Sequence, residues 1–465
     1  MKSINGDIEG ILSSLFEEID SLRSEVSRLT RLVEKKDAEI ADLRGRLAKY
    51  EKPTKDSGNS SVPPTKDSIA KQAIRHTSSL RKPTGRKSGG QPGHEGHTLC
   101  RDMEPDETVA HAPEVCECCG KPLDPSAARE VSSHYTVDFR VVRHVTRHVS
   151  YECRCQCGHT THACLPEGMR HGVNYGPMTE ALAAYLLHGQ YVPMARVRQI
   201  MSDVFGLKPS EGTIQNMVRS IGEKAEFPYE VIRQRIEGSR VVGADETGAA
   251  VQSENNWAWV FQNKGGTYVF FDRSRGIKAV EKHFPQHFGS SIIVSDRHST
   301  YSTMETGGRQ VCLAHLLRNL EYLNQLDEGQ TWSCEFQDLL RDAIRTRPSC
   351  GEPLPDAAVA EGFRLRAERL IDTDLSRLDG EFEKLRHGIA KVKDFLFTFL
   401  REKDVPPDNN ASERAVRIIK VKQKVSGCFR TALGADIYAR IHSILDTAHK
   451  NGQSKYQALL ALAMT

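Results

Sequence analysis

The sequence lacks the long apolar runs that membrane proteins need. No stretch approaches about 18 consecutive apolar residues, so the sequence predicts no transmembrane helix. Residues 1–10 contain no basic segment followed by an apolar one, and we therefore expect no secretory signal. A large net charge is also absent, and the value of +3 by itself says almost nothing about partners. The remaining composition, 38% hydrophobic and 27% charged over 465 residues, predicts a soluble chain of roughly two to four domains.

Cysteine is too scarce for a small disulfide scaffold, and it is unevenly placed. Seven of the 12 cysteines lie between residues 116 and 164, which in a cytosolic chain indicates metal binding more often than disulfides. Cys116 and Cys119 form a CxxCG knuckle, and a β-like stretch follows at residues 135–149. Three cysteines and a histidine come after that stretch, namely Cys153, Cys155, Cys157 and His159.

Two knuckles separated by strands are what a tetrahedral zinc ribbon requires, with two thiolates from each turn. We therefore predict a structural Zn²⁺ site in a zinc-ribbon module at residues 101–170. The second pair of ligands stays open, because Cys155 is an alternative to Cys153 and His159 is a reserve ligand. The expected ligand set is Cys116, Cys119, Cys153 and Cys157.

The first 50 residues show the heptad repeat of a coiled coil. Apolar or aromatic residues occupy eleven of the twelve a and d positions between Leu12 and Tyr50, and Lys36 is the exception. β-branched residues at a with Leu at d favour a parallel dimer. Residues 1–50 are therefore expected to be a dimerisation helix that makes the protein at least a homodimer. The alternative is an amphipathic helix that lies on its own domain.

Residues 51–100 differ in composition from the rest of the chain. They are rich in Pro, Ser, Gly, Thr and Lys, which predicts a mostly extended, mobile linker. Between residues 52 and 101 ten basic residues stand against three acidic ones, a net charge of +7. A basic, flexible arm suits the phosphate backbone of nucleic acid, with Lys82, Arg86 and Lys87 as candidate contacts. The alternative is a solvated linker that only keeps the chain soluble.

Residues 171–235 show helical patterns broken by a short turn. A helix at residues 196–205 is followed by a turn in which Ser210 can cap a second helix over residues 211–224. Helix, short glycine-containing turn and helix are typical of a helix-turn-helix, so this module is a candidate for DNA binding. Plain helical packing explains the same pattern equally well.

The next part of the chain shows alternating strand and helix signals. Asp245 closes the first expected strand, Asp296 closes the fourth, and Glu246 points the opposite way on an extended chain and is excluded. This is the skeleton of an RNase H-like fold, in which the first and fourth strands are neighbours and their carboxylates converge. Two such oxygen donors suit Mg²⁺ or Mn²⁺. Strands are expected at residues 240–245, 257–261, 267–272 and 291–296, with a helix at 276–287.

A third carboxylate is expected from a later helix. Residues 406–410 are a strong helix start, and Glu413 falls in the first turn. Asp408 competes for the same role, and an ion pair between Glu413 and Arg417 is the simpler structural interpretation. No acidic residue occurs from residue 414 to 435, so this stretch suits DNA beside a metal site. Its six basic residues are Arg414, Arg417, Lys420, Lys422, Lys424 and Arg430.

Several short motifs accompany these carboxylates. They are GGQPGHEG at residues 89–96, YVPMAR at 191–196, DET at 245–247, DRHSTY at 296–301, AHLLR at 314–318 and NNASERAVR at 409–417. With them the chain resembles, nearly end to end, the DDE transposases of the insertion sequence sixty-six family. Two features depart from the family pattern. Gly248 stands where many members have proline, and the second cysteine knuckle is not a simple CxxC.

The resemblance implies a multidomain α/β architecture. The coiled coil, the linker, the zinc-ribbon-like module and the helix-turn-helix-like module would precede an RNase H-like DDE catalytic domain. That domain would consist of residues 236–301 and 402–450, with a helical insertion at 302–401 and a tail at 451–465.

The resemblance also implies a chemistry. Asp245, Asp296 and Glu413, the last favoured over Asp408, would hold two divalent ions, Mg²⁺ or Mn²⁺. One ion would activate a water and later a DNA 3′-OH, and the other would stabilise the leaving oxygen. Auxiliary residues would be His315, Arg318, Arg414 and Arg417.

The function implied in this way is DNA transposition. The enzyme would bind transposon ends, cleave them and join them to double-stranded target DNA. Accessory proteins of the same element would be further partners, and the expected location is the bacterial cytoplasm, at the nucleoid. Two other classes fit the same residues. They are a catalytically inactive DNA-binding regulator and an RNase H-like nuclease without strand transfer.

Overall fold

The computed structural model describes residues 2–48, 52–60, 62, 67, 104–166, 169, 172, 174–286, 288–348 and 353–465. The chain divides into two compact units. The first contains the N-terminal helix and the α/β core, as residues 1–72, 170–198 and 209–465. The second contains the cysteine-rich module, as residues 73–169 and 199–208.

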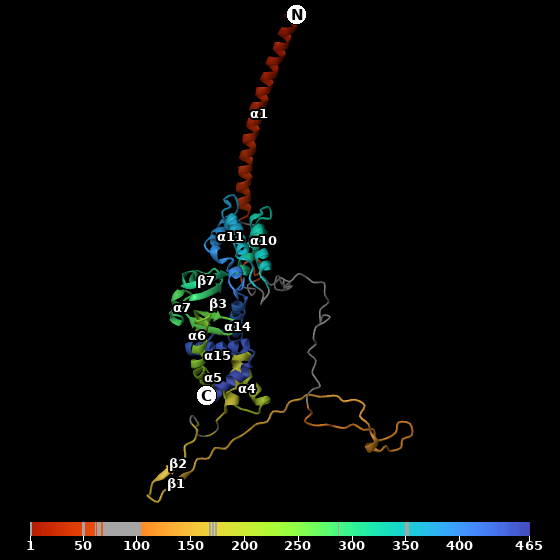
Figure 1. Ribbon diagram of the computed structural model, residues 1–465, viewed down its shortest axis with the longest axis vertical. Helices are drawn as coiled ribbons and strands as arrows, with labels where there is room; N and C mark the ends of the chain where they lie inside the picture. The colour runs from red at the N-terminus through yellow and green to blue at the C-terminus, as the bar shows by residue number, and fades with distance from the viewer. Residues whose placement is uncertain are drawn as a thin grey trace. The chain divides into compact units, whose positions relative to one another are not determined.

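A long helix, α1 (Lys2–Ala48), opens the chain (Figure 1). All its residues from 20 to 44 are exposed, including Val26 and Val33 of the apolar seam, at 61% and 59%. This stretch therefore does not lie on the chain's own domain, and its pairing as a coiled coil stays a prediction. No helix of the described residues combines the length and the apolar character needed to cross a membrane.

A five-stranded mixed sheet organises the first unit, in the order β5-β4-β3-β6-β7 (Figure 1). The pairs β3–β4 and β4–β5 are antiparallel, whereas β3–β6 and β6–β7 are parallel. The first and fourth strands along this part of the chain are thus neighbours, as the sequence predicted. The strands are β3 (Val241–Val251), β4 (Glu254–Gln262), β5 (Thr267–Asp272), β6 (Phe288–Ser295) and β7 (Thr306–Val311).

Strand β3 continues past Asp245, where the sequence predicted its end. Its ladder with β4 runs from Gly243 opposite Gln262 to Val251 opposite Glu254. The connecting residues Gln252 and Ser253 both have positive φ, which is the two-residue hairpin turn that matches strand twist. The expected boundary was wrong because this hairpin extends the pairing and makes Asp245 an internal strand residue.

The two faces of the sheet have different cores. On one face small and branched side chains such as Val260 pack against α14 (Asn410–Ser426) and α15 (Ala432–Lys450). On the other face Trp259 and Phe261 stack with aromatic rings near α7 (Ile277–His283) and α8 (Ser299–Thr303). This division follows from the two-residue period of β4, which sends neighbouring side chains to opposite faces.

A helical insertion lies between β7 and α14, and its core, with Phe336 and Phe382 fully buried, continues onto Ile292 and Val294 of β6. It was expected to begin at residue 302, but residues 306–311 form β7 because their backbone pairs with β6. Glycines 307 and 308 weaken the strand signal there. The helices are α9 (Leu313–Leu326), α10 (Trp332–Thr346), α11 (Ala357–Ile371), α12 (Gly380–Ala390) and α13 (Thr398–Arg401), with a 3₁₀ turn at Lys393–Phe395.

Further helices pack at the other end of the α/β core. Ser210 caps α5, as predicted, by accepting a hydrogen bond from the backbone N–H of Thr213 at 3.0 Å. The expected tail at residues 451–465 is wrong, because α16 forms there and buries Leu459. These helices are α3 (Pro177–Ala184) with its π-helical continuation Tyr185–Gly189, α5 (Glu211–Lys224), α6 (Glu226–Glu237) and α16 (Lys455–Met464). The boundary between the two units falls within α4 (Met194–Asp203).

The second unit contains little regular structure. β1 (Glu152–Arg154) and β2 (Thr160–His162) form a short antiparallel hairpin, and Pro125–Ala127 is a 3₁₀ turn. The strand expected at residues 135–149 is wrong, since these residues form no ladder with any described segment and Val142 is 84% exposed. β-branched composition alone does not make a strand without a paired neighbour.

The segment expected to be a linker is partly packed. Residues 52–60 lie against α9 and α12, and Asn59 and Ser60 are buried, so this part is not a mobile linker. Residues 68–103, with the motif at 89–96, lie outside the described residues.

Two glycines of α5 provide a stability test of the packing between α5 and α15. A Cβ at Gly222 would lie 2.7 Å from Cγ2 of Ile437 in α15, whereas one at Gly212 would meet only Ser210 Oγ at 3.7 Å. We expect Gly222→Ala to lower the free energy of unfolding by on the order of 1 kcal/mol through overpacking. Gly212→Ala should raise it by roughly 0.5–1 kcal/mol. Thermal denaturation of the two variants measures both, and equal shifts would contradict the packing of α5 on α15.

Candidate active site

Three carboxylates reach one region of the first unit from three elements. Asp245 lies in β3, Asp296 directly follows β6, and Glu413 lies in the first turn of α14. The parallel ladder of β3 and β6 ends with Gly243 opposite Val294. Each aspartate stands two residues beyond that pair, so the two are in register on neighbouring strands.

These carboxylates influence one another electrostatically. Burial raises the pKa of Asp245 well above its ordinary value, and the charges of Glu246, Asp296 and Glu413 raise it further. Carboxylates that repel one another in a partly buried place form a site that a divalent cation stabilises. Because all the donors are oxygen atoms, the residues fit Mg²⁺ or Mn²⁺.

The start of α14 is fixed to β3 and α9 by buried hydrogen bonds. Asn409 Nδ2 donates to the carbonyl oxygen of Ala244 at 2.7 Å, and the backbone N–H of Asn409 donates to Cys312 Sγ at 3.2 Å. One turn on, Gln262 Nε2 donates to Ser412 Oγ at 3.3 Å. These bonds fix the first turn of α14 against β3, and Glu413, the residue after Ser412, is then near enough for its charge to raise the pKa of Asp245.

The Glu413 side chain is surrounded by cationic or ionisable groups. Its carboxylate lies 3.6 Å from Arg318 Nη2, 3.7 Å from Arg417 Nη2 and 3.7 Å from His315 Nδ1. Burial, together with the charge of Arg318, lowers the pKa of His315 to about 4, so His315 is neutral near pH 7 and forms no ion pair. Glu413 Oε1 and His315 Nδ1 are buried without a hydrogen-bond partner, and such buried polar atoms are rare.

Cys312 gives Glu413 a second set of neighbours. One ligand atom from each of Cys312, His315 and Glu413 lies within 4.8 Å of the others. Burial raises the pKa of the Cys312 thiol to about 12, so it stays protonated near neutral pH. A thiol and an imidazole are softer donors than carboxylates, so this set suits Mg²⁺ or Mn²⁺ less well than the three carboxylates do.

The Asp408 side chain lies at a different position from the Glu413 side chain. Its Oδ1 accepts a hydrogen bond from the backbone N–H of Asn410 at 3.1 Å. It lines a cavity of about 670 Å³ together with Gly243 and Lys450, and its charge is not among those that raise the pKa of Asp245. This geometry favours Glu413 over Asp408 as the third carboxylate.

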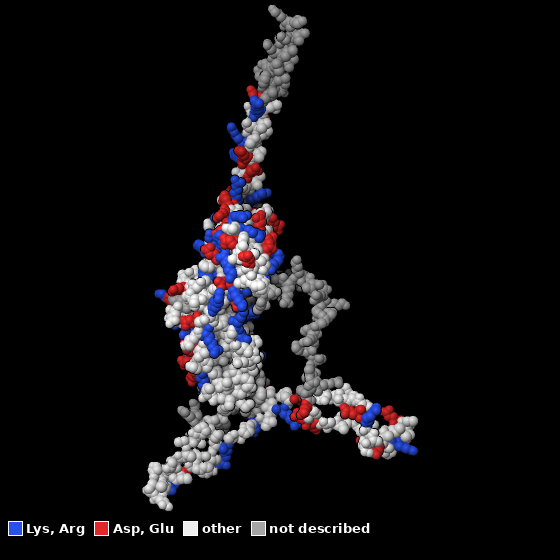
Figure 2. All heavy atoms as spheres, viewed as in Figure 1, with Lys and Arg blue, Asp and Glu red and all other residues white. Residues whose placement is uncertain are grey.

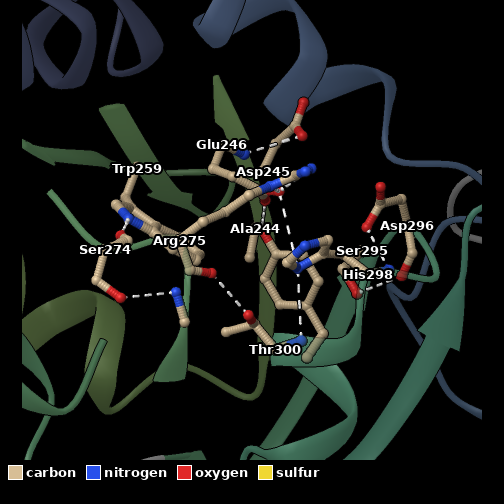
Figure 3. Close-up of polar contacts among 12 residues, drawn as sticks. Ala244, Asp245, Glu246, Trp259, Ser274, Arg275, Ser295, Asp296, His298 and Thr300 are labelled. Carbon is tan, nitrogen blue, oxygen red and sulfur yellow. Dashed lines mark hydrogen bonds and ion pairs between the residues drawn. The ribbon is translucent and has the colours of Figure 1, made fainter. Parts of the chain in front are cut away.

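Glu246 lies on the opposite face of β3 from Asp245, because it pairs with Trp259 whereas Asp245 pairs with Val260. Its side chain is only 1% exposed and forms an ion pair with Arg275 at 2.8 Å (Figure 3). The Tyr301 hydroxyl, on α8, donates to the other carboxylate oxygen. Glu246 thus ties β3 to the segment that follows Asp296, and is a positioning residue.

Sequence reasoning missed the roles of Arg275, Tyr301 and Asn409. Tyr301 and Asn409 were visible as members of two motifs, but nothing in the motifs said what they bond. For Arg275 we find no sequence signal.

The cations predicted to contact DNA lie partly on one helix. Arg414, Arg417, Lys420 and Lys424 of α14 are exposed, and so is Arg430. Lys422 is half-buried, and burial lowers its pKa. In Figure 2 blue side chains outnumber red ones over the surface where Figure 1 places α14. Lys82, Arg86 and Lys87 lie outside the described residues.

The cysteines of the second unit form two close pairs. Hydrogen bonds from Cys119 and Cys118 lower the pKa of Cys116, and those from Cys157 lower the pKa of Cys155. Cys153 instead lies in β1, opposite Thr161. No group of four cysteines is assembled within the described residues, so the zinc site stays a prediction.

Comparison with known proteins identifies the family. The profile of the Transposase IS66 family matches residues 172–437, more than half of the chain, and the chain therefore belongs to this family. Residues 13–99 match a second profile, described as a family of unknown function (DUF6444).

Two similar proteins from Sinorhizobium fredii support this result. Over 358 residues, 68% of this chain and 63% of its own length, the uncharacterized protein y4qI is 25% identical. The uncharacterized protein y4jO is 27% identical over 172 residues, 37% of this chain and 52% of its own length. The chain thus spans less than two thirds of either relative.

The repulsion at Asp245 predicts a pH-dependent gain of stability for Asp245→Asn without divalent cations. Because burial raises the pKa of Asp245 in the folded state, the wild type loses stability as pH rises from about 4 through that raised value. The melting temperatures of the two proteins should be similar below pH about 4, and the variant's should be higher by a few degrees at neutral pH. Added Mg²⁺ should stabilise only the wild type. A variant no more stable at neutral pH would contradict the repulsion.

The Glu246 ion pair predicts a loss of stability for Glu246→Gln. Arg275 would lose the carboxylate that neutralises it, and because the Arg275 side chain is 41% exposed, we expect a cost of roughly 1–2 kcal/mol, below that of a fully buried pair. The matched control is Glu254→Gln, which breaks an exposed pair with Arg273 and should change the free energy of unfolding by less than about 1 kcal/mol. Thermal denaturation compares the two, and equal losses would contradict the positioning role.

Proposed function

We propose that the protein is a DDE transposase that cleaves transposon ends and joins them to double-stranded target DNA. The observation that carries this proposal is that Asp245 on the central strand, Asp296 just after β6 and Glu413 on α14 lie near enough for the charges of Asp296 and Glu413 to raise the pKa of Asp245. Their sheet, in the order β5-β4-β3-β6-β7, has the strand order that we assign to an RNase H-like core. Membership of a transposase family supports the same conclusion.

Asp245, Asp296 and Glu413 are the residues that would hold Mg²⁺ or Mn²⁺, two ions in the proposed site. When bound, such ions polarise the phosphate and lower the pKa of a water or hydroxyl nucleophile. Arg318 and Arg417 hold the Glu413 carboxylate from two sides and offer hydrogen-bond donors to phosphate oxygens. The buried Nδ1 of neutral His315 has no hydrogen-bond partner and is available for one to a bound phosphate without adding charge.

The exposed cations of α14 provide the approach for DNA. Arg414, Arg417, Lys420 and Lys424 follow Glu413 on the same helix, so a phosphate backbone bound along α14 passes beside the carboxylates. The exposed apolar seam of α1 supports a homodimer, which suits a protein that must hold two DNA ends.

We assign a structural Zn²⁺ to the second unit. The hydrogen bonds between Cys155 and Cys157 favour this pair over Cys153 as partners of Cys116 and Cys119. A lowered pKa eases formation of the thiolate that zinc requires.

Two alternative functions, a nuclease and a catalytically inactive regulator, can be distinguished from transposition. A nuclease with the same carboxylates cuts DNA without joining it, so a strand-transfer assay with pre-cleaved ends separates the two. A catalytically inactive regulator needs none of the three carboxylates, and the presence of all three disfavours it.

Substitution of the carboxylates tests the proposal. Asp245→Ala should lower strand cleavage and strand transfer with Mg²⁺ by about 1000-fold or more, the equivalent of about 4 kcal/mol of activation free energy. Glu413→Gln should cause a similar loss, whereas Asp408→Asn should stay within about tenfold of the wild type. Folding of each variant is checked by thermal denaturation. Persistent cleavage and joining by Asp245→Ala would overturn the proposal, and a reversed order of the last two variants would overturn Glu413.

A further inference from the structure

Residues 52–60 make three polar contacts with the helical insertion. Lys52 Nζ lies 3.0 Å from Asp379 Oδ2, and Lys55 Nζ lies 3.1 Å from Glu381 Oε2, both on the start of α12. Asn59 Nδ2 donates to Gln325 Oε1 of α9 at 2.8 Å. The contacts are thus two ion pairs and one hydrogen bond between side-chain amides.

The segment has a defined conformation of its own. Asn59 is only 2% exposed, and its side chain also donates to the Thr54 carbonyl oxygen and accepts from the Asp56 backbone N–H. Asp67, 7% exposed, accepts from both the backbone N–H and the hydroxyl of Ser57. Buried polar groups whose bonds are all made specify one arrangement, because any other leaves them unsatisfied.

The surface of the insertion that contacts this segment, which we call the seat, complements the segment in charge. Lys55 Nζ lies 4.7 Å from the centre of the Tyr322 ring, so its ammonium contacts both an aromatic face and a carboxylate. The side-chain hydrogen bond with Asp379 raises the pKa of Lys52. Asp379 in turn caps α12 by accepting the backbone N–H of Glu381, so the seat is a fixed helix end.

The sequence repeats the contacting motif. Pro-Thr-Lys-Asp-Ser occurs at residues 53–57 and again at residues 64–68. Both copies lie within the match to the family of unknown function at residues 13–99, while the seat lies within the match to the transposase family at 172–437. The contact therefore joins two regions of the chain that match separate families.

We propose that residues 52–60 are a docking segment that binds, within the same copy of the chain, to the seat formed by Tyr322 and Gln325 of α9 and Asp379 and Glu381 of α12. This docking fixes the segment that follows α1 to the insertion, so a dimer formed through α1 holds its two catalytic domains by their insertions. The dimer rests on the proposed function, whereas the docking does not.

A zero-length crosslink between amines and carboxylates tests the docking in the full chain. Carbodiimide treatment of an equal mixture of ¹⁴N- and ¹⁵N-labelled protein should join Lys52 to Asp379 and Lys55 to Glu381. Links confined to one isotope are expected because the segment docks on its own copy, and mixed-isotope links would contradict this arrangement. The positive control is Lys282 with Asp272, an ion pair of the α/β core at 2.5 Å. Absence of both segment links while this control pair is joined would overturn the proposal.

Hydrogen exchange with charge reversal provides a second test. Lys55→Glu should speed amide exchange across residues 52–60 by about tenfold or more, because the segment leaves its seat. The double variant with Glu381→Lys should restore slow exchange. The matched control is Lys391→Glu, an exposed lysine just after α12, which should leave these amides unchanged. Unchanged exchange in Lys55→Glu, or no restoration in the double variant, would count against the docking segment.

Discussion

The candidate site depends on holding like charges together. Asp245, Asp296 and Glu413 repel one another, and partial burial strengthens the repulsion because the protein screens charge less well than water. The packing of the sheet and of helix α14 resists this repulsion. The register of β3 with β6 sets the positions of the two aspartates, and the bond from Asn409 to the backbone of β3 sets that of the helix that carries Glu413. The carboxylates therefore come into electrostatic range of one another only when sheet and helix are both folded.

Sequence predicted those parts of the fold that depend on near neighbours. Strand β5 has the predicted bounds, and Ser210 caps its helix, because alternation and capping are local. The errors concern partners that are distant in the chain. Residues 306–311 contain two glycines and form a strand only because β6 offers its edge, while the β-branched stretch at 135–149 has no such neighbour among the described residues. Strand propensity is realised by pairing, so composition alone misjudged both segments.

The same limit applies within the site. Strand alternation correctly separated Glu246 from Asp245, since β4 places Trp259 and Val260 on opposite faces. It did not show that Glu246 would be buried, because its partners Arg275 and Tyr301 lie 29 and 55 residues further along the chain. A buried carboxylate needs such partners, and only the fold supplies them. The sequence thus predicted which strands and helix carry the three carboxylates, but it did not predict the residues that bond to Glu246.

Helix α14 carries both an anionic residue of the candidate site and a row of exposed cationic residues. Its first turn brings Glu413 to an anionic cluster, while Arg414 and Arg417 and the lysines that follow remain exposed. The helical period separates these cations from Ala415 and Ile419, which pack against the sheet. In the proposed function an anionic phosphodiester approaches these carboxylates and is repelled by them, and cations on the same helix reduce that repulsion. Because one helix carries both groups, the proposed DNA contacts and the carboxylate geometry depend on the same placement of α14.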